Sequence, residues 1–197
     1  MDSLSAKALA LLPNSFRFQY AIALGVHRRA LAHLQASGEI EKLGRGVYRK
    51  AVAVGDGRDD LVVVFQRAPE AVLCLDSALY FHGLGTRIPH QVTIAVERKA
   101  WLPVIKQPPV QAFRFSGEAF TEGIEQHDVQ GVTVRVYSKA KTVADCFKYR
   151  NKLGLETALE ALRSLVGMPG FTTSDLLHCC RICRVEKVVQ PYLEALL

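Results

Sequence analysis

Residues 25 to 50 read GVHRRALAHLQASGEIEKLGRGVYRK, and this stretch predicts a helix followed by a short hairpin. In a helix, residues three or four positions away from Leu31 lie on the same face as Leu31. Leu34, His27 and Gln35 then fall on the same side as Leu31. We expect this side of the helix to pack inward against the rest of its domain.

The opposite side of the same helix is cationic and shallow. It carries Arg29, Ala32, His33 and Ala36, with Arg28 on the flank. Arginine can reach base edges or phosphates, and small residues let a helix lie deep in the DNA major groove. We therefore predict a recognition helix in which Arg28, Arg29 and His33 contact double-stranded DNA.

A hairpin rich in glycine follows this helix. Gly38 is placed to end the helix as a C-terminal cap, and residues 39–43 and 47–50 alternate as two short strands. The tip, Gly44-Arg45-Gly46, can adopt positive φ angles and present one arginine. Basic side chains of such a wing suit backbone phosphates or the flanking minor groove. The residues predicted to make these contacts are Lys42, Arg45 and Arg49.

The preceding residues predict the remaining helices of a winged helix-turn-helix domain. Residues 3–12 predict a first helix that Pro13 ends, and Asn14 or Ser15 can cap a second helix. Gly25 would supply the tight turn between the second helix and the recognition helix. The alternative is a solvated basic face on an unrelated small domain, and the two preceding helices favour the winged helix.

The length of 197 residues fits one large or two small domains. Residues 51–58 contain two glycines and no periodicity, so we interpret them as a linker. We expect a winged helix over residues 1–54 and a second domain over residues 59–197. Through residue 58 there are nine Lys and Arg against four Asp and Glu, whereas the remainder has sixteen against fifteen. This asymmetry is typical of a nucleic-acid-binding module joined to a neutral partner.

The second domain is predicted to be α+β. Predicted strands cover residues 71–73, 91–96, 111–115, 123–129 and 132–137. Predicted helices cover residues 61–67, with Asp59 or Asp60 as the cap, and residues 77–82, 139–151, 155–166, 173–182 and 185–196. Asp76 and Ser138 are expected to cap two of the helices. Residues 71–73 could also be the approach to a helix. The pattern predicts a small, mostly antiparallel sheet with helices segregated to one face.

The apolar runs of the chain are too short to span a membrane. Runs such as residues 61–65 and 71–75 fall far below the roughly 18 residues of a membrane-spanning helix. The first residues, MDSLS, lack the basic region that precedes the apolar core of a secretory leader. We therefore expect a cytoplasmic protein without a membrane partner.

Five cysteines, an odd number, do not match a disulfide framework and are expected to be reduced thiols. His178, Cys179, Cys180 and Cys183 form a cluster of ligand-type residues, but a second pair at zinc-site spacing is absent. Cys179 and Cys183 share one face of a predicted helix, so we interpret them as small core residues. No Walker or Rossmann phosphate loop occurs, and we expect neither a cofactor nor a metal.

Several short motifs together resemble the AbiEi-type antitoxin family. In chain order they are RGVY at 45–48, CLDSAL at 74–79 with HGL at 82–84, VYS at 136–138 leading into KTVAD at 141–145, and YLEAL at 192–196. The resemblance spans nearly the whole chain. This family is the regulator half of type IV toxin-antitoxin and phage abortive-infection systems.

The resemblance implies an N-terminal winged helix that represses its own promoter and a C-terminal domain that antagonises a nucleotidyltransferase-like toxin without a required stable complex. An operator with inverted repeats would need two copies of the chain, from a dimer or from cooperative monomers. One departure is His27, where relatives commonly begin the recognition helix with a small hydroxyl residue that can cap it. A stand-alone regulator with no toxin beside it is the alternative within this family.

Lys141 and Asp145 stand four residues apart on one predicted helix face and can pair with each other. Catalysis would need a substrate pocket and a second acid or base, and the sequence shows neither. We interpret the pair as a structural ion pair, and a role in toxin antagonism is the alternative.

Two other functions compete with a sequence-specific DNA-binding repressor. One is a protein-interaction module that its basic N-terminal domain tethers non-specifically to nucleic acid, which predicts sequence-independent affinity with a steep salt dependence. The other is an enzyme, such as a nuclease or a protein that modifies the toxin. The carboxylates are dispersed rather than clustered for metal binding, so we expect no enzymatic activity.

Overall fold

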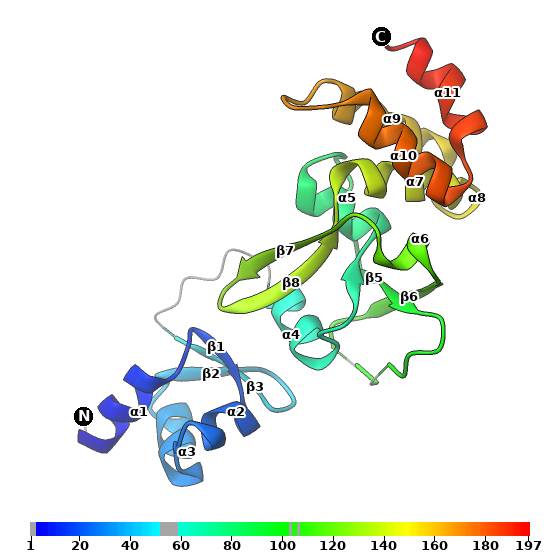
Figure 1. Cartoon of the computed structure of the whole chain (residues 1–197). Coiled ribbons are helices and arrows are strands. Elements are labelled where there is room, and N and C mark those ends of the chain that lie inside the picture. The colour runs from blue at the N-terminus through cyan, green and yellow to red at the C-terminus, as the bar shows by residue number, and fades with distance from the viewer. Residues whose placement is uncertain (1–2, 52–58, 103, 106) are drawn as a thin grey trace. The chain divides into compact units, whose positions relative to one another are not determined.

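The computed structural model describes residues 3–51, 59–102, 104, 105 and 107–197. These residues group into two compact units (Figure 1). The N-terminal unit holds the described residues up to Pro69, with those in 105–108 and 127–134. The C-terminal unit holds the described residues in 70–104, 109–126 and 135–197.

Helices and a small antiparallel sheet make up the N-terminal unit. In chain order its elements are α1 (Ser3–Leu11), β1 (Ser15–Arg17), α2 (Phe18–Ala23), α3 (Arg28–Ala36), β2 (Ile40–Gly44), β3 (Val47–Lys50) and α4 (Asp59–Arg67). The sheet has the order β1-β3-β2, and both of its strand pairs are antiparallel. The hairpin predicted after the recognition helix is therefore present as β2 and β3.

Strand β1 corrects the prediction that Asn14 or Ser15 caps the second helix. Ser15 pairs with Arg49 of β3, and α2 begins only at Phe18. The side chain of Phe16 is buried and its ring stacks on Tyr48, with 5.9 Å between the centroids. Packing of this aromatic pair and pairing with a strand more than 30 residues away outweigh the local capping preference of Ser15.

Helix α3 contributes two leucines to the core of the N-terminal unit. Leu31 and Leu34 are buried among Phe16, Val26 and Ile40, as the spacing of three predicted for the two leucines. The prediction that His27 and Gln35 share this inward side is wrong, because both are exposed. His27 lies at the N-cap before the helix begins, so the helical angle does not apply to it.

Three glycines occupy the turns that the sequence assigned to them. Gly25 precedes α3 with φ of 84°, Gly38 follows it with φ of 74°, and Gly46 lies between β2 and β3 with φ of 75°. The N–H groups of Gly38 and Glu39 donate to the carbonyls of Gln35 and Leu34, which closes the end of α3. A residue with a Cβ would be strained at these φ angles.

The C-terminal unit combines a sheet with a set of helices. The elements after α4 are β4 (Val72–Leu73), α5 (Leu75–His82), β5 (Val92–Glu97), β6 (Val110–Phe115), α6 (Glu118–Thr121), β7 (Ile124–Val129), β8 (Val132–Tyr137), α7 (Lys139–Lys148), α8 (Arg150–Leu153), α9 (Leu155–Val166), α10 (Thr173–Cys183) and α11 (Glu186–Glu194). Residues 127–134, which include the end of β7 and the start of β8, group with the N-terminal unit, and the other residues of these elements form the C-terminal unit. The predicted α+β class is confirmed.

The five-stranded sheet has the order β6-β5-β4-β8-β7 and is mixed in direction. Strands β4 and β5 are antiparallel, but β5 pairs with β6 in parallel and β4 pairs with β8 in parallel. The expectation of a mostly antiparallel sheet therefore needs correction. The segment between β5 and β6 is long enough for β6 to start beside the beginning of β5, as a parallel pair requires. No local sequence signal distinguishes this arrangement from an antiparallel hairpin.

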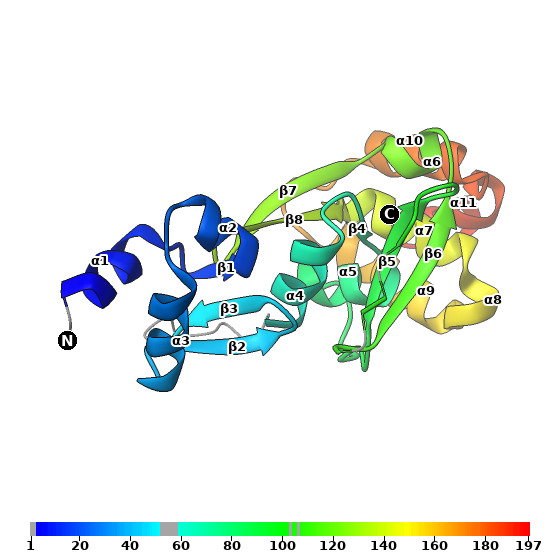
Figure 2. The same ribbon diagram turned by 90° about the horizontal axis from the view of Figure 1, so that it is seen from below.

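Helices α7, α9, α10 and α11 gather on one side of this sheet (Figures 1 and 2). Their apolar residues share one core with strand residues such as Phe113, Phe115 and Tyr137. The predicted cap at Ser138 is confirmed, since its hydroxyl accepts from the N–H of Lys141. Asp76, the other predicted cap, lies inside the first turn of α5 instead, and Cys74 occupies the N-cap position without a side-chain capping hydrogen bond.

The sequence predicted domains over residues 1–54 and 59–197, whereas α4 groups with the N-terminal unit. The predicted linker lies, apart from Ala51, outside the described residues. The domain limits therefore stay a prediction. Among the described residues, no helix is both long and apolar enough to cross a bilayer.

Candidate nucleic-acid interface

Helix α3 turns one face to the core and the other to solvent. The side chains of Leu31 and Leu34 are buried, with relative exposures of 3% and 0%, whereas Arg28, Arg29 and His33 are exposed. All three residues predicted to contact DNA are thus on the solvent side of one short helix. The guanidinium of Arg28 lies 5.3 Å from the ring centroid of Phe18 on α2, a cation–π contact that favours one orientation of this side chain.

The hairpin presents two of its three predicted cations. Lys42 of β2 and Arg45 at the tip are both exposed. The tip is held from behind, since Nη2 of Arg67 on α4 donates to the carbonyl of Arg45 at 2.8 Å. The backbone of the tip is therefore fixed to α4 while the side chain of Arg45 remains exposed.

Arg49, the third predicted hairpin contact, has partners within the N-terminal unit. Its Nε donates to Oε1 of Glu41 at 2.6 Å, and its Nη1 donates to Oδ1 of Asp59. The side chain of Arg49 is only 13% exposed. Burial opposes the charged form, but the hydrogen bonds and charges of both carboxylates outweigh burial and raise the pKa of Arg49. The structure therefore gives this residue a role in joining β2, β3 and the start of α4.

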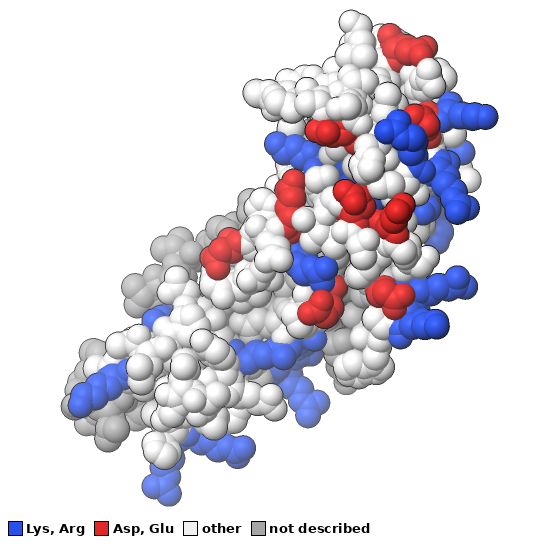
Figure 3. All heavy atoms as spheres, in the orientation of Figure 1, with Lys and Arg blue, Asp and Glu red and all other residues white. Residues whose placement is uncertain are grey.

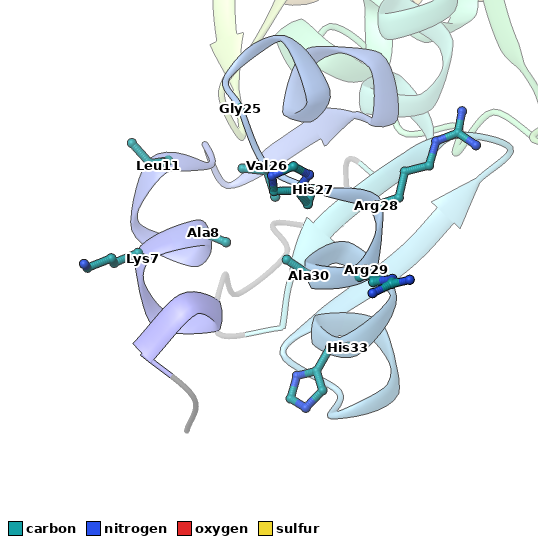
Figure 4. A pocket seen from close by; sticks show the side chains of 10 residues that line it. All are labelled: Lys7, Ala8, Leu11, Gly25, Val26, His27, Arg28, Arg29, Ala30 and His33. Atoms are coloured by element: carbon teal, nitrogen blue, oxygen red, sulfur yellow. The ribbon is translucent and has the colours of Figure 1, made fainter.

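A hollow of about 810 Å³ lies between α1 and α3. Figure 4 shows Ala8 of α1 and Ala30 of α3 pointing toward each other across it, with His27 at one end. Lys7 leaves the outer side of α1, and Arg29 leaves α3 on the opposite side (Figure 4). Lys7 was not among the predicted contacts, because a single lysine on a short helix carries no sequence signal of its own.

Positive charge accumulates on this part of the surface. Figure 3 shows Lys and Arg side chains standing out over α1, α3 and the hairpin. None of the described residues that line the hollow is acidic. The exposed helix face, the hairpin tip and the hollow together form a surface suited to a polyanion.

The second predicted site, Lys141 and Asp145, is completely buried. Lys141 Nζ lies 2.8 and 2.6 Å from the two carboxylate oxygens of Asp145, and both side chains have 0% exposure. The predicted ion pair is therefore present. No atom of either side chain can touch a partner protein without local unfolding of the C-terminal unit.

Aromatic rings and a thiol surround this ion pair. Lys141 Nζ lies 4.2 Å from the ring centroid of Tyr137 and 5.1 Å from that of Phe115. The thiol of Cys183 donates to Oδ1 of Asp145 at 3.1 Å. Burial raises the pKa of the Asp145 carboxyl, and the charge of Lys141 opposes this rise. The cluster joins β6, β8, α7 and α10 through one polar network in an apolar core.

All five cysteines are free thiols and buried. Cys179 and Cys183 pack in the core of the C-terminal unit, as their shared helix face predicted. Burial raises the pKa of the Cys179 thiol to about 11. Among the described residues, no group of three or more His, Cys, Asp and Glu is arranged to hold a metal ion.

Comparison of folds finds a similar solved structure, that of the RV2827C protein from Mycobacterium tuberculosis. The match has a TM-score of 0.55 at 14% sequence identity and covers 97% of this chain and 79% of that chain. At this identity the likeness concerns the fold alone. No curated protein matches the sequence significantly.

A family model described as "Transcriptional regulator, AbiEi antitoxin" matches residues 7–49. The matched segment runs from α1 into β3 and contains α3 and the hairpin tip. The resemblance predicted from the sequence is thereby confirmed over these residues. Residues 7–49 carry the sequence pattern of the AbiEi antitoxin family of transcriptional regulators.

Proposed function

We propose that this chain is a sequence-specific DNA-binding repressor of the antitoxin type. The single observation that carries the proposal is the solvent face of α3, where Arg28, Arg29 and His33 lie opposite the buried Leu31 and Leu34. A helix anchored by an apolar face and cationic on the other can enter a major groove without disturbing its own core. The family match over residues 7–49 supports the same role.

In this proposal the N-terminal unit works as a winged helix-turn-helix domain. Helices α2 and α3 with Gly25 between them form the helix-turn-helix, and β2 and β3 form the wing. Arg28, Arg29 and His33 read the major groove. Lys42 and Arg45 contact phosphates or the flanking minor groove, and Arg49 holds the wing in shape through Glu41 and Asp59.

The operator in this proposal is double-stranded DNA at the promoter of the chain's own operon. An operator of inverted repeats requires two copies of the chain, as a dimer or as cooperative monomers. The protein acts in the cytoplasm, where its cysteines stay reduced, and it carries out no catalysis.

The C-terminal unit in this proposal antagonises a nucleotidyltransferase-like toxin of a type IV, phage-defence system, without a required stable complex. Lys141 and Asp145 support this role only indirectly, because they are buried and fix the arrangement of α7 and α10. Any surface that acts on the toxin or on its target must come from exposed residues around them.

An anisotropy titration tests DNA binding. Labelled DNA from immediately upstream of the gene is compared with a scrambled duplex of equal composition, at several salt concentrations. We expect a preference of at least about a hundredfold for the upstream DNA. Equal affinity for both duplexes would favour a protein-interaction module tethered non-specifically to nucleic acid, and no binding to either would reject the proposed role of α3.

A growth assay tests the antitoxin role separately. A nucleotidyltransferase-like gene neighbouring this one is induced alone, with the full chain, or with the chain carrying Arg29→Ala. We expect the full chain to restore growth, and the variant to restore it as well when both genes are under foreign promoters. If the full chain did not relieve the growth arrest, the result would favour the alternative, a stand-alone regulator without a toxin partner.

A further inference from the structure

Strand β6 lies at one end of the five-stranded sheet, and β5 is its one strand neighbour among the described residues. The two strands pair in parallel along the whole of β6. The N–H of Val92 donates to the carbonyl of Pro109, and backbone groups alternate in direction along a parallel ladder. The N–H and C=O groups of Val110, Ala112 and Arg114 therefore point away from β5. No other described residue forms a backbone hydrogen bond with them on that side.

A free strand edge is a template for a strand from another chain. Proteins commonly block such an edge with a proline, a bulge or a charged side chain. Strand β6 reads VQAFRF, without a proline, and its pairing with β5 has no register shift. The charged residue of β6, Arg114, is turned onto the loop after β5, where its Nη1 donates to the carbonyls of Glu97 and Arg98. The edge of β6 therefore lacks the usual protection.

Basic side chains from α7 and α8 lie over the same strand. Lys148 Nζ lies 5.8 Å from the ring centroid of Phe115, and Lys152 Nζ lies 5.3 Å from that of Phe113. Both rings belong to β6, and both lysines are exposed. Residues 146–155 contain no Asp or Glu, and Figure 3 shows Lys and Arg side chains standing out over α8. The free edge is therefore flanked by positive charge on the face that α7 and α8 cover.

We propose that the edge of β6 accepts an extended, acidic segment of a partner protein as an additional strand of the sheet. The main chain of that segment pairs with the outward groups of Val110, Ala112 and Arg114. Side chains alternate between the two faces of a strand, so every second residue of the segment lies on the face of Lys148 and Lys152. Acidic residues at those positions complement the two ammonium groups.

Other occupants fit this edge less well. A second copy of β6 would bring its own two lysines next to Lys148 and Lys152, and like charges on neighbouring strands repel. A nucleic-acid strand would neutralise the lysines, but it lacks the regularly spaced N–H and C=O groups that pair with a strand edge. The inference goes beyond the proposed DNA binding, because β6, α7 and α8 all belong to the C-terminal unit.

Fluorescence anisotropy of the full chain with a labelled hexapeptide of alternating valine and glutamate tests the charge preference. We expect saturable binding that is at least about tenfold tighter than that of the valine–lysine hexapeptide. The double variant Lys148→Glu with Lys152→Glu should reverse this preference. Arg163→Glu with Lys187→Glu, at exposed positions of α9 and α11, changes the net charge equally and should keep it.

Two further changes test strand pairing itself. Ala112→Pro removes an N–H that points away from β5, so it should prevent peptide binding without breaking a bond to β5. Two N-methylated forms of the glutamate peptide, one methylated at the valines and one at the glutamates, keep the charges. Because alternate residues bond to opposite sides, one of these forms should bind at least about tenfold more weakly than the parent peptide. This comparison needs no change in the protein.

The outcomes decide between the occupants. Glutamate-peptide binding that the charge reversal and one N-methylated form both weaken supports the inference, whether or not the chain recognises DNA. Binding that neither weakens overturns it, as does the absence of peptide binding. An oligothymidylate that binds through Lys148 and Lys152 while the peptide does not would assign the surface to nucleic acid. Sedimentation velocity that shows a dimer of the wild-type chain but not of Ala112→Pro would assign the edge to a second copy and overturn the inference.

Discussion

Lys141 Nζ lies within 2.8 Å of both carboxylate oxygens of Asp145, one helical turn away, and neither side chain has any exposed surface. The two charges neutralise each other in an apolar core that also contains Phe115, Tyr137 and Cys183. A buried ion pair of this kind contributes little net stability, but each member depends strongly on the other.

Replacement of one partner should therefore be costly. We expect Lys141→Met to lower the free energy of unfolding by about 3 to 5 kcal/mol, because it leaves the Asp145 carboxylate buried without a counter-charge. The double variant Lys141→Met with Asp145→Leu should recover most of that loss. Urea denaturation measures both variants and the wild-type protein, with Lys139→Met, which replaces an exposed lysine on the same helix, as the control. A loss below about 1 kcal/mol for Lys141→Met would contradict the uncompensated charge.

Alkaline pH should destabilise the C-terminal unit through its buried thiols. The pKa of Cys179 rises from 9.0 to about 11 because burial disfavours the thiolate, and that of Cys180 rises to about 12. Between pH 9 and 11 the unfolded chain releases a proton from Cys179 that the folded chain keeps. Stability is therefore complete below pH 9 and falls as pH rises, by at most about 1.4 kcal/mol per pH unit for each thiol.

Urea denaturation between pH 8 and 10.5, in the presence of a reductant, measures this decline. Cys179→Ala should make the decline shallower than in the wild-type protein while lowering stability at pH 8. Equal slopes for the two proteins would show that the Cys179 thiol does not control the alkaline behaviour.

Arg29 and Lys42 should affect DNA binding differently. Arg29 lies on the groove-facing side of α3 in our proposal, so Arg29→Ala should weaken binding to the operator by about 1 to 3 kcal/mol and relax sequence preference. Lys42 on β2 contacts phosphate in the same proposal, so Lys42→Ala should weaken binding to all sequences alike and reduce the salt slope by about one unit. Anisotropy titrations measure both effects, with Arg163→Ala on the exposed face of α9 as the control. Unchanged affinity in both variants would reject the winged-helix proposal.

Arg49 should act on the shape of the hairpin rather than on phosphates. We expect Arg49→Gln to lower stability by about 1 kcal/mol, a value appropriate to a pair whose acidic partners are partly exposed. The salt slope of DNA binding should stay within about half a unit of the wild-type slope. Lys42→Ala is the matched comparison on the neighbouring strand. A slope that falls by a full unit in Arg49→Gln would instead indicate a direct phosphate contact.

Much of the fold could be predicted because it depends on residues close together in the chain. The leucine spacing of three in α3, the glycines at 25, 38 and 46, and the cap at Ser138 each act within one turn of backbone. The exposed positions of Arg28, Arg29, His33, Lys42 and Arg45 follow from the same local pattern. Their contact with DNA remains a prediction.

The remaining features depend on partners far away in the chain. Ser15 joins a strand because β3 lies beside it, and β5 pairs in parallel with β6, which follows it only after a long connecting segment. The hollow exists because Ala8 and Ala30, on helices apart in sequence, face each other.

By itself, then, the sequence determined most of the longer helices, the glycine turns and the cationic face of α3, since backbone preferences and side-chain periodicity are local. Only the tertiary structure decided that Arg49 binds Glu41 and Asp59 and that Lys141 and Asp145 lose all contact with water. Burial and charge pairing depend on which elements pack together, and that packing is a property of the whole chain.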